Sequence, residues 1–165
     1  MSFRLSKARA SLEFRVIVFA FCNSHERWIC LSSELNLPAD AVIKGVAAEL
    51  EKNEKFKPPA WYGTVKSSAS GERLPESPKL WYTRVAAVLR TVALRGPVGV
   101  QRLRHKYGGR KEHTRSRAHH VLGSGKTLRV AFQQLESAGY VAKSEKGGRV
   151  ITAAGHSLLD KAVKA

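Results

Sequence analysis

Apolar side chains first recur at helical spacing shortly after Pro38. Ile43, Val46 and Leu50 stand at i, i+3 and i+7, and Asp40 lies near the start of the series. This pattern predicts an amphipathic helix over residues 39–52. The prolines in 57–61 predict an extended connection after it. A short segment, 62–66, then leads into a polar loop at 67–71.

A second apolar stripe defines the central helix. Its members recur at i, i+4, i+7 and i+11: Trp81, Val85, Val88 and Val92. Ser77-Pro78 supplies an N-cap and a proline at the first helical position, and Gly96-Pro97 closes the helix. On this helix Arg84 and Arg95 border the stripe, whereas Arg90 projects from the opposite face.

Further elements follow in quick succession. Residues 99–107 predict a short helix that buries Val100, Leu103 and Tyr107 and leaves Arg102, Arg104 and Lys106 outward. Residues 110–125 have little apolar periodicity and are predicted to be a basic loop.

A third helix is predicted from Ser124 or Gly125 to Ala138-Gly139, with its apolar face on Leu128, Phe132 and Leu135. Residues 140–151 predict a hairpin with a glycine turn. Thr152 caps a last helix that buries Leu158, Leu159, Ala162 and Val163.

Helix, helix, basic loop, helix, hairpin, helix is the order of a winged-helix unit. The predicted fold class is therefore mainly α: a helical bundle with a winged-helix-like unit and a small β-hairpin. A chain of 165 residues supports one domain with an appended arm. We assign residues 37–165 to the domain and residues 1–36 to an N-terminal extension of unknown role.

The extension contains an apolar run at 16–22 that follows several basic residues. This run is at the short limit for a signal peptide, Glu13 and Arg15 interrupt the approach to it, and no small-x-small cleavage site follows. It is too short to span a bilayer. An amphipathic organelle-targeting arm is one alternative. We favour a lineage-specific extension, or an arm that orders only against a partner.

The distribution of charge indicates the class of binding partner more clearly than any motif does. Between Lys79 and Arg129 lie thirteen basic side chains and one acid, Glu112, so this stretch holds +12 of the formal +16 of the chain. The pI is about 10.4. So one-sided an excess indicates a polyanionic partner, and the phosphate backbone of nucleic acid is the commonest. An anionic membrane surface would attract the same charge, but there is no lipidation signal, so we expect no membrane partner.

Several motifs suggest other functions, but the residues around them do not support those functions. Gly123-Ser124-Gly125-Lys126-Thr127 resembles part of a phosphate-binding loop, but the required first glycine is His120. A glycine-rich helix start with Lys126 still offers backbone N–H groups and positive charge to a phosphate.

Four histidines lie in or near the basic loop at irregular spacing, without cysteines: His105, His113, His119 and His120. They are better explained as members of a basic surface than as zinc ligands. Cys22 and Cys30 are interpreted as free thiols in a reducing compartment. Acids are too few for paired carboxylates, and no Ser/His/Asp set is found, so we expect no enzyme, no metal site and no cofactor.

The pair Trp81-Tyr82 could stack on unpaired bases. Because Trp81 heads the apolar stripe, we place it in the core and expect Tyr82 to be the exposed ring.

Four separated segments are recognisable in order: Leu80–Ala87, Leu94–Val100, Lys106–Arg110 and Gly147–Gly155. Together with Pro59-Ala60-Trp61 they resemble the archaeal and eukaryotic small-subunit ribosomal protein nineteen of the "e" type, over roughly residues 37–165. The resemblance implies a winged-helix-like protein that binds ribosomal RNA in the head of the small (40S) subunit and is needed for maturation of that subunit. It also implies neighbouring ribosomal proteins and assembly factors as partners, and a cytoplasmic location after nucleolar passage.

In that family, arginines of the central and later helices contact RNA, which here fall on Arg84, Arg90 and Arg129, and the basic loop falls on 110–126. From charge and resemblance together, the predicted RNA-binding residues are Tyr82, Arg84, Arg90, Arg95, Arg102, Arg104, Lys106, Arg110, Lys111, Arg115, Arg117, Lys126 and Arg129. The rival hypothesis is a winged-helix DNA-binding transcriptional regulator that places Lys126, Arg129 and Gln133 in a major groove.

Overall fold

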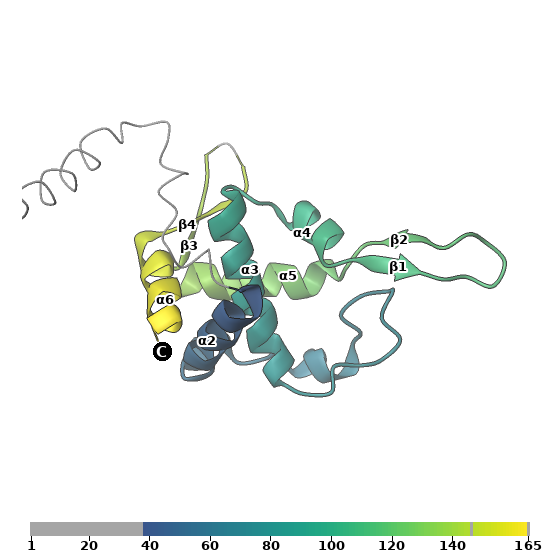
Figure 1. The fold of residues 1–165 in the computed structure, drawn as a ribbon, viewed down its shortest axis with the longest axis horizontal. Helices are drawn as coiled ribbons and strands as arrows, with labels where there is room; N and C mark the ends of the chain where they lie inside the picture. The colour runs from purple at the N-terminus through teal and green to yellow at the C-terminus, as the bar shows by residue number, and fades with distance from the viewer. Residues whose placement is uncertain (1–37, 146, 165) are drawn as a thin grey trace, which may run out of the picture. The chain divides into compact units, whose positions relative to one another are not determined.

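Five α-helices and two β-hairpins make up the part of the chain that the structure describes, residues 38–145 and 147–164 of a computed structural model (Figure 1). The helices are α2 (Ala39–Glu51), α3 (Lys79–Arg95), α4 (Val100–Lys106), α5 (Gly125–Ser137) and α6 (Ala153–Lys164). Two 3-10 turns, η2 (Glu54–Phe56) and η3 (Ala60–Thr64), connect α2 to the rest. Strand β1 (Gly109–Lys111) pairs with β2 (His119–Val121), and β3 (Val141–Lys143) with β4 (Arg149–Ile151), both antiparallel. The mainly α prediction is confirmed.

Helix α3 forms the centre of the core, and its apolar stripe is buried as predicted. Trp81 is fully buried, and its ring meets the rings of Tyr62 and Trp61 edge-on, with centroids 5.0 and 6.4 Å away. Its Nε1 donates a hydrogen bond to Oε1 of Gln134 on α5 at 3.1 Å. This satisfies the polar end of the buried indole and locks α3 against α5.

The ends of α3 follow the predicted signals. The backbone N–H of Lys79 donates to Ser77 Oγ at 3.2 Å, so the serine satisfies one of the free donors of the first turn. At the other end Gly96 has φ of 70°, a conformation that glycine adopts without strain.

The β3–β4 hairpin is attached to the helices by Arg149. Its backbone exchanges hydrogen bonds of 3.0 and 3.1 Å with Val98, just beyond α3. Its side chain reaches Glu136 Oε1 on α5 at 2.8 Å and lies 4.7 Å from the ring centre of Phe132. The hairpin therefore occupies the position of the wing, next to α5.

Helices α2 and α6 cross at close range. A Cβ placed on Gly45 would lie 2.4 Å from the carbonyl oxygen of Ala162, so only glycine allows this approach. Thr152 caps α6 as predicted: its hydroxyl oxygen accepts the N–H of Gly155 at 3.4 Å.

The prediction of a loop over 110–125 is wrong in part, because β1 and β2 form a hairpin there that projects from the helices as an arm (Figure 1). Its register pairs Gly109 with Val121 and Lys111 with His119. Most of its side chains are exposed on both faces, so the sequence shows no alternation of apolar and polar residues. Backbone pairing alone defines these strands.

The extension at 1–36, with its apolar run and both cysteines, lies outside the described residues. Over 38–145 and 147–164, none of the helices has both the length and the apolar content needed to cross a bilayer.

Candidate nucleic-acid interface

The outward face of α3 alternates apolar and cationic side chains. Leu80, Ala87 and Leu94 follow one another at intervals of seven residues, and both leucines are well exposed, at 46% and 39%. Arg84 and Arg95 lie on one side of this line and Arg90 on the other, as expected from helical spacing. The helix thus offers a flat surface with cations along both edges.

Cations of α3 and α4 lie near the hydroxyl groups of Thr91 and Tyr107. The guanidinium of Arg84 lies 4.4 Å from the ring centre of Tyr107, and Lys106 Nζ donates to Thr91 Oγ1 at 2.6 Å. The hydroxyls of Thr91 and Tyr107 are 3.3 Å apart. Arg90 contributes an Nε that lies beneath the surface without a hydrogen-bond partner among the described residues.

The effect of this crowding is visible in the pKa values. Burial, then the positive charges of Arg95 and Arg90, lower the pKa of Lys106 below its ordinary value. Burial raises the pKa of Tyr107, and the Thr91 hydrogen bond and nearby arginines oppose that rise. In the free protein these neighbouring cations repel one another, and a bound anion would reduce that repulsion.

The start of α5 carries the second group of cations. Lys126 is exposed, and its ammonium lies 4.8 Å from the ring centre of Trp61 on η3. Arg129 follows one turn later and is exposed. The segment before α5 is the exposed β1–β2 hairpin, not the buried strand that a nucleotide-binding loop requires.

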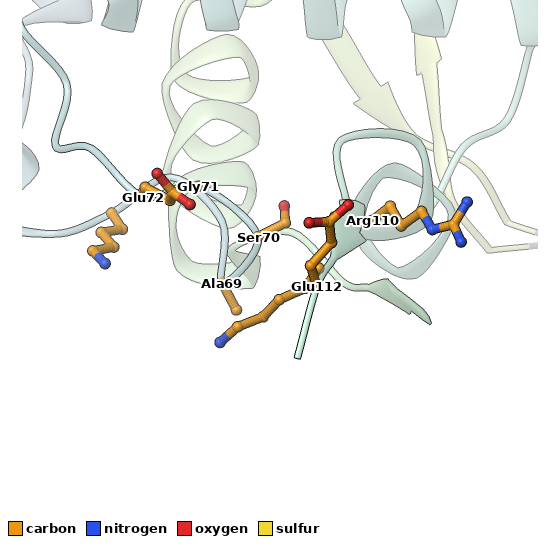
Figure 2. Close-up of a pocket in the computed structure, with 8 residues that line it drawn as sticks. Ala69, Ser70, Gly71, Glu72, Arg110 and Glu112 are labelled. Carbon is orange, nitrogen blue, oxygen red and sulfur yellow. The ribbon is translucent and has the colours of Figure 1, made fainter. Parts of the chain in front are cut away.

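The arm carries the third group. Arg110, Lys111, Arg115 and Arg117 are all exposed. At the base of the arm, a hollow of about 380 Å³ separates β1 from the 66–72 loop. Figure 2 shows Ser70 of the loop and Glu112 of the arm on its lining, with the guanidinium of Arg110 directed away from both.

The arm is held to the body at this base. The N–H of Gly123 donates to the carbonyl of Arg104 at 2.9 Å, and the N–H of Ser124 to that of Ser67 at 3.1 Å. A Cβ on Gly123 would lie 2.9 Å from the carbonyl oxygen of Tyr107, so the close approach needs glycine. These contacts fix the direction of the arm relative to α4 and α5.

The structure places the predicted residues on α3, α4, the arm and the start of α5, and leaves most of them exposed. Nine are exposed: Arg95, Arg102, Lys106, Arg110, Lys111, Arg115, Arg117, Lys126 and Arg129. Four are half-buried: Tyr82, Arg84, Arg90 and Arg104. Within the described residues the ion pairs are Lys52–Glu49 and Arg149–Glu136, so none of the twelve predicted cations is neutralised by a carboxylate there.

Two details differ from prediction. Tyr82 is not a freely exposed ring, because it lies half-buried against the core next to Trp81. Arg104 does not project outward: its Nε donates to the carbonyl of Gly123 at 3.2 Å and its Nη1 to Gln101 Oε1 at 3.2 Å. Arg104 thus supports the base of the arm.

Sequence reasoning missed the groups that hold these cations in place. Trp61, Thr91 and Tyr107 each contact a cation, yet none was singled out for that purpose. The sequence shows the aromatic residues at 61 and 107, but the cations that they contact lie on other elements. No local sequence pattern therefore indicates these contacts.

Comparison with known proteins decides the family. The model of the family described as ribosomal protein S19e matches residues 35–165. The chain belongs to this family. It is 41% identical over 129 residues to the small ribosomal subunit protein eS19 of Haloarcula marismortui, an alignment that covers 76% of this chain and 84% of the relative.

Two more relatives with the same name agree. The protein of Emericella nidulans is 42% identical over 130 residues, covering 78% of this chain and 88% of the relative. The protein of Thermoplasma volcanium is 38% identical over 128 residues, covering 78% and 85%. S19e is a family of ribosomal proteins and not of enzymes, in agreement with the prediction from the sequence.

Proposed function

We propose that this S19e protein is a structural constituent of the small ribosomal subunit that binds ribosomal RNA in the subunit head and is needed for maturation of the subunit. The observation that supports this most strongly is the set of twelve cations on α3–α4, the arm and the start of α5, none paired with a carboxylate in the described part of the chain. Cations that are not paired with carboxylates are available to bind the phosphates of RNA.

The predicted RNA-binding residues divide by role under this proposal. One phosphate-binding group is on α3 and α4 (Arg84, Arg90, Arg95, Arg102 and Lys106), the arm provides a second, and Lys126 with Arg129 a third. Arg104 contributes to RNA binding indirectly, by supporting the arm. Tyr82 also contributes indirectly, by packing α3 against the core. Residues 37–165 form the RNA-binding domain. Neighbouring proteins of the head and assembly factors are its other partners, with nucleolar passage before the cytoplasm in cells that have a nucleolus.

Phosphate contacts position a protein without reading sequence, so the shape of the folded RNA supplies most of the specificity. The DNA-regulator alternative predicts instead that charge is concentrated on one recognition helix. Here the cations extend over α3, α4, the arm and α5, and α5 carries only two of the twelve.

Sedimentation of a cell lysate on a sucrose gradient tests the proposal. In the presence of EDTA, which separates the subunits, the protein should remain with the small subunit in near-stoichiometric amount and resist a moderate salt wash. Depletion should reduce mature small subunits and leave large subunits in excess. A protein found at the top of the gradient would contradict the ribosomal role.

A further inference from the structure

A small hollow adjoins the Arg84 cluster on the surface of α3. It has a volume of about 240 Å³ and lies between α2, η3 and the first turns of α3. Its lining includes Ile43, Tyr62, Ser67, Leu80, Arg84 and Ala87. We propose that this hollow holds one unpaired nucleobase of the bound RNA, whose phosphate is held by Arg84; this inference rests on the proposed function.

The lining combines apolar surface with hydroxyl groups and a cation. Thr83 also lines the hollow, and its hydroxyl donates to the carbonyl of Leu80 at 3.0 Å. Tyr62 and Ser67 contribute two more hydroxyl groups to the lining, and Arg84 contributes a positive charge. The hollow therefore suits a ligand with apolar faces, polar edges and an attached anion, which describes a nucleotide.

The surroundings favour RNA over a protein side chain as the occupant. Arg84 lines the hollow and lies 4.4 Å from the ring centre of Tyr107, and Lys106 Nζ lies 5.7 Å from the same ring centre, so an anionic chain that leaves the hollow meets further cations. The exposed Leu80 provides a flat apolar edge at the entrance. A partner protein with an apolar side chain would gain nothing from the unpaired cations.

Two substitutions test the hollow from opposite directions. Ala87→Leu fills it, and Leu80→Ala removes a wall; because Leu80 is 46% exposed, the second change leaves the core intact. Leu74→Ala is the control, since Leu74 is an exposed leucine that lies before α3, outside the proposed surface, and does not line the hollow. Each full-length variant is titrated with transcribed small-subunit ribosomal RNA at several salt concentrations.

Both hollow variants should bind about tenfold more weakly, because stacking of one base is lost. The dependence of binding on salt should keep its slope, because no phosphate contact is removed. Leu74→Ala should bind within about twofold of the wild type. Arg84→Gln should instead reduce the slope by about one unit.

A second measurement needs no knowledge of the RNA site. The protein is titrated with an oligouridylate and with an abasic ribose-phosphate chain of equal length. The wild type should prefer the base-bearing chain by about tenfold, and Ala87→Leu should abolish the preference.

The outcomes separate the two proposals. If the wild type does not bind the ribosomal RNA at all, the proposed function fails and the hollow with it. If Arg84→Gln weakens binding but Ala87→Leu and Leu80→Ala bind like the wild type, only the nucleobase site is wrong. Unchanged RNA affinity together with poor incorporation into subunits would assign the hollow to a neighbouring protein and overturn the proposal.

Discussion

Tyr62 and Tyr107 lie beneath the cationic surface of α3, and burial raises the pKa of both phenols. The unfolded chain ionises these tyrosines near pH 10, whereas the folded protein keeps them protonated to a higher pH. Above pH 10 the native state therefore binds more protons than the unfolded state, and stability falls as pH rises.

We accordingly expect Tyr107→Phe to reduce this alkaline loss of stability. Urea denaturation of the wild type and variant between pH 8 and about pH 11 should show a smaller decrease in the free energy of unfolding for the variant. Tyr82→Phe is the control, as a tyrosine at the edge of the core on α3. An equal decrease in all three proteins would show that these buried phenols do not control alkaline stability.

The turn of the wing depends on two adjacent glycines in the same conformation but in different surroundings. Gly147 and Gly148 have φ of 87° and 91°, but a Cβ on Gly148 would also lie 3.2 Å from the backbone of Pro97 and Val98. Gly147→Ala meets no atom within 4 Å. We expect Gly147→Ala to cost about 1 kcal/mol from backbone strain and Gly148→Ala about 2 kcal/mol. Thermal denaturation should rank them in that order; equal losses would exclude a role for the contact with Val98.

At the scale of elements, helix propensity and packing conflict at Gly45 in α2. Alanine is normally favoured over glycine in a helix by about 1 kcal/mol. A Cβ here would lie 2.4 Å from the backbone of α6, so the close crossing decides the outcome. We expect Gly45→Ala to destabilise the protein by about 2 kcal/mol. The measurement is urea denaturation, with Ala48→Gly, at an exposed position of the same helix, as a control for propensity alone. A stabilised Gly45→Ala variant would show that α6 can shift freely.

The arm separates RNA binding from stability. Residues 112–118 connect the paired residues Lys111 and His119, so an Asn-Gly turn can replace them without disturbing the register. This removes Arg115 and Arg117 and no part of the core. We expect an unchanged melting temperature and a salt slope for RNA binding that is lower by about two units. A large fall in melting temperature would mean that the arm supports the fold.

The sequence was most informative where one face of an element is buried. The stripes of α3 and α5, which include Trp81 and Phe132, were predicted because apolar residues recur there at helical spacing and are buried. The wing was predicted because a glycine turn separates its two strands. The arm was missed because exposure on both faces leaves no such signal. The contact of Lys126 with Trp61 joins residues far apart in the chain, and only the assembled core brings them together.

At the scale of the whole molecule, cations on separate elements should act nearly independently. Arg84 stands on α3 and Arg129 on α5, with no carboxylate paired to either of them in the described residues. The double variant Arg84→Gln and Arg129→Gln should lower the salt slope of RNA binding by about two units, the sum of the single changes.

Lys52→Gln is the control for charge alone in this experiment. Lys52 lies at the end of α2, outside the proposed surface, and pairs with Glu49 at 2.7 Å. Its slope should match the wild type. If Lys52→Gln lowers the slope as much as Arg84→Gln does, net charge and not the position of the cations would govern binding.

The crossing of α2 and α6 also has a consequence for how the protein is made. Gly45 and Ala162 are 117 residues apart (162 minus 45), yet they touch in the finished fold. At a synthesis rate of about 5–20 residues per second, α2 waits on the order of ten seconds for its partner. During that interval the basic helices α3 and α5 have already emerged, while one side of α2 has no neighbour to cover it. The nascent chain thus meets other polyanions before α6 covers α2. Whichever molecule binds the chain first must protect it during this interval.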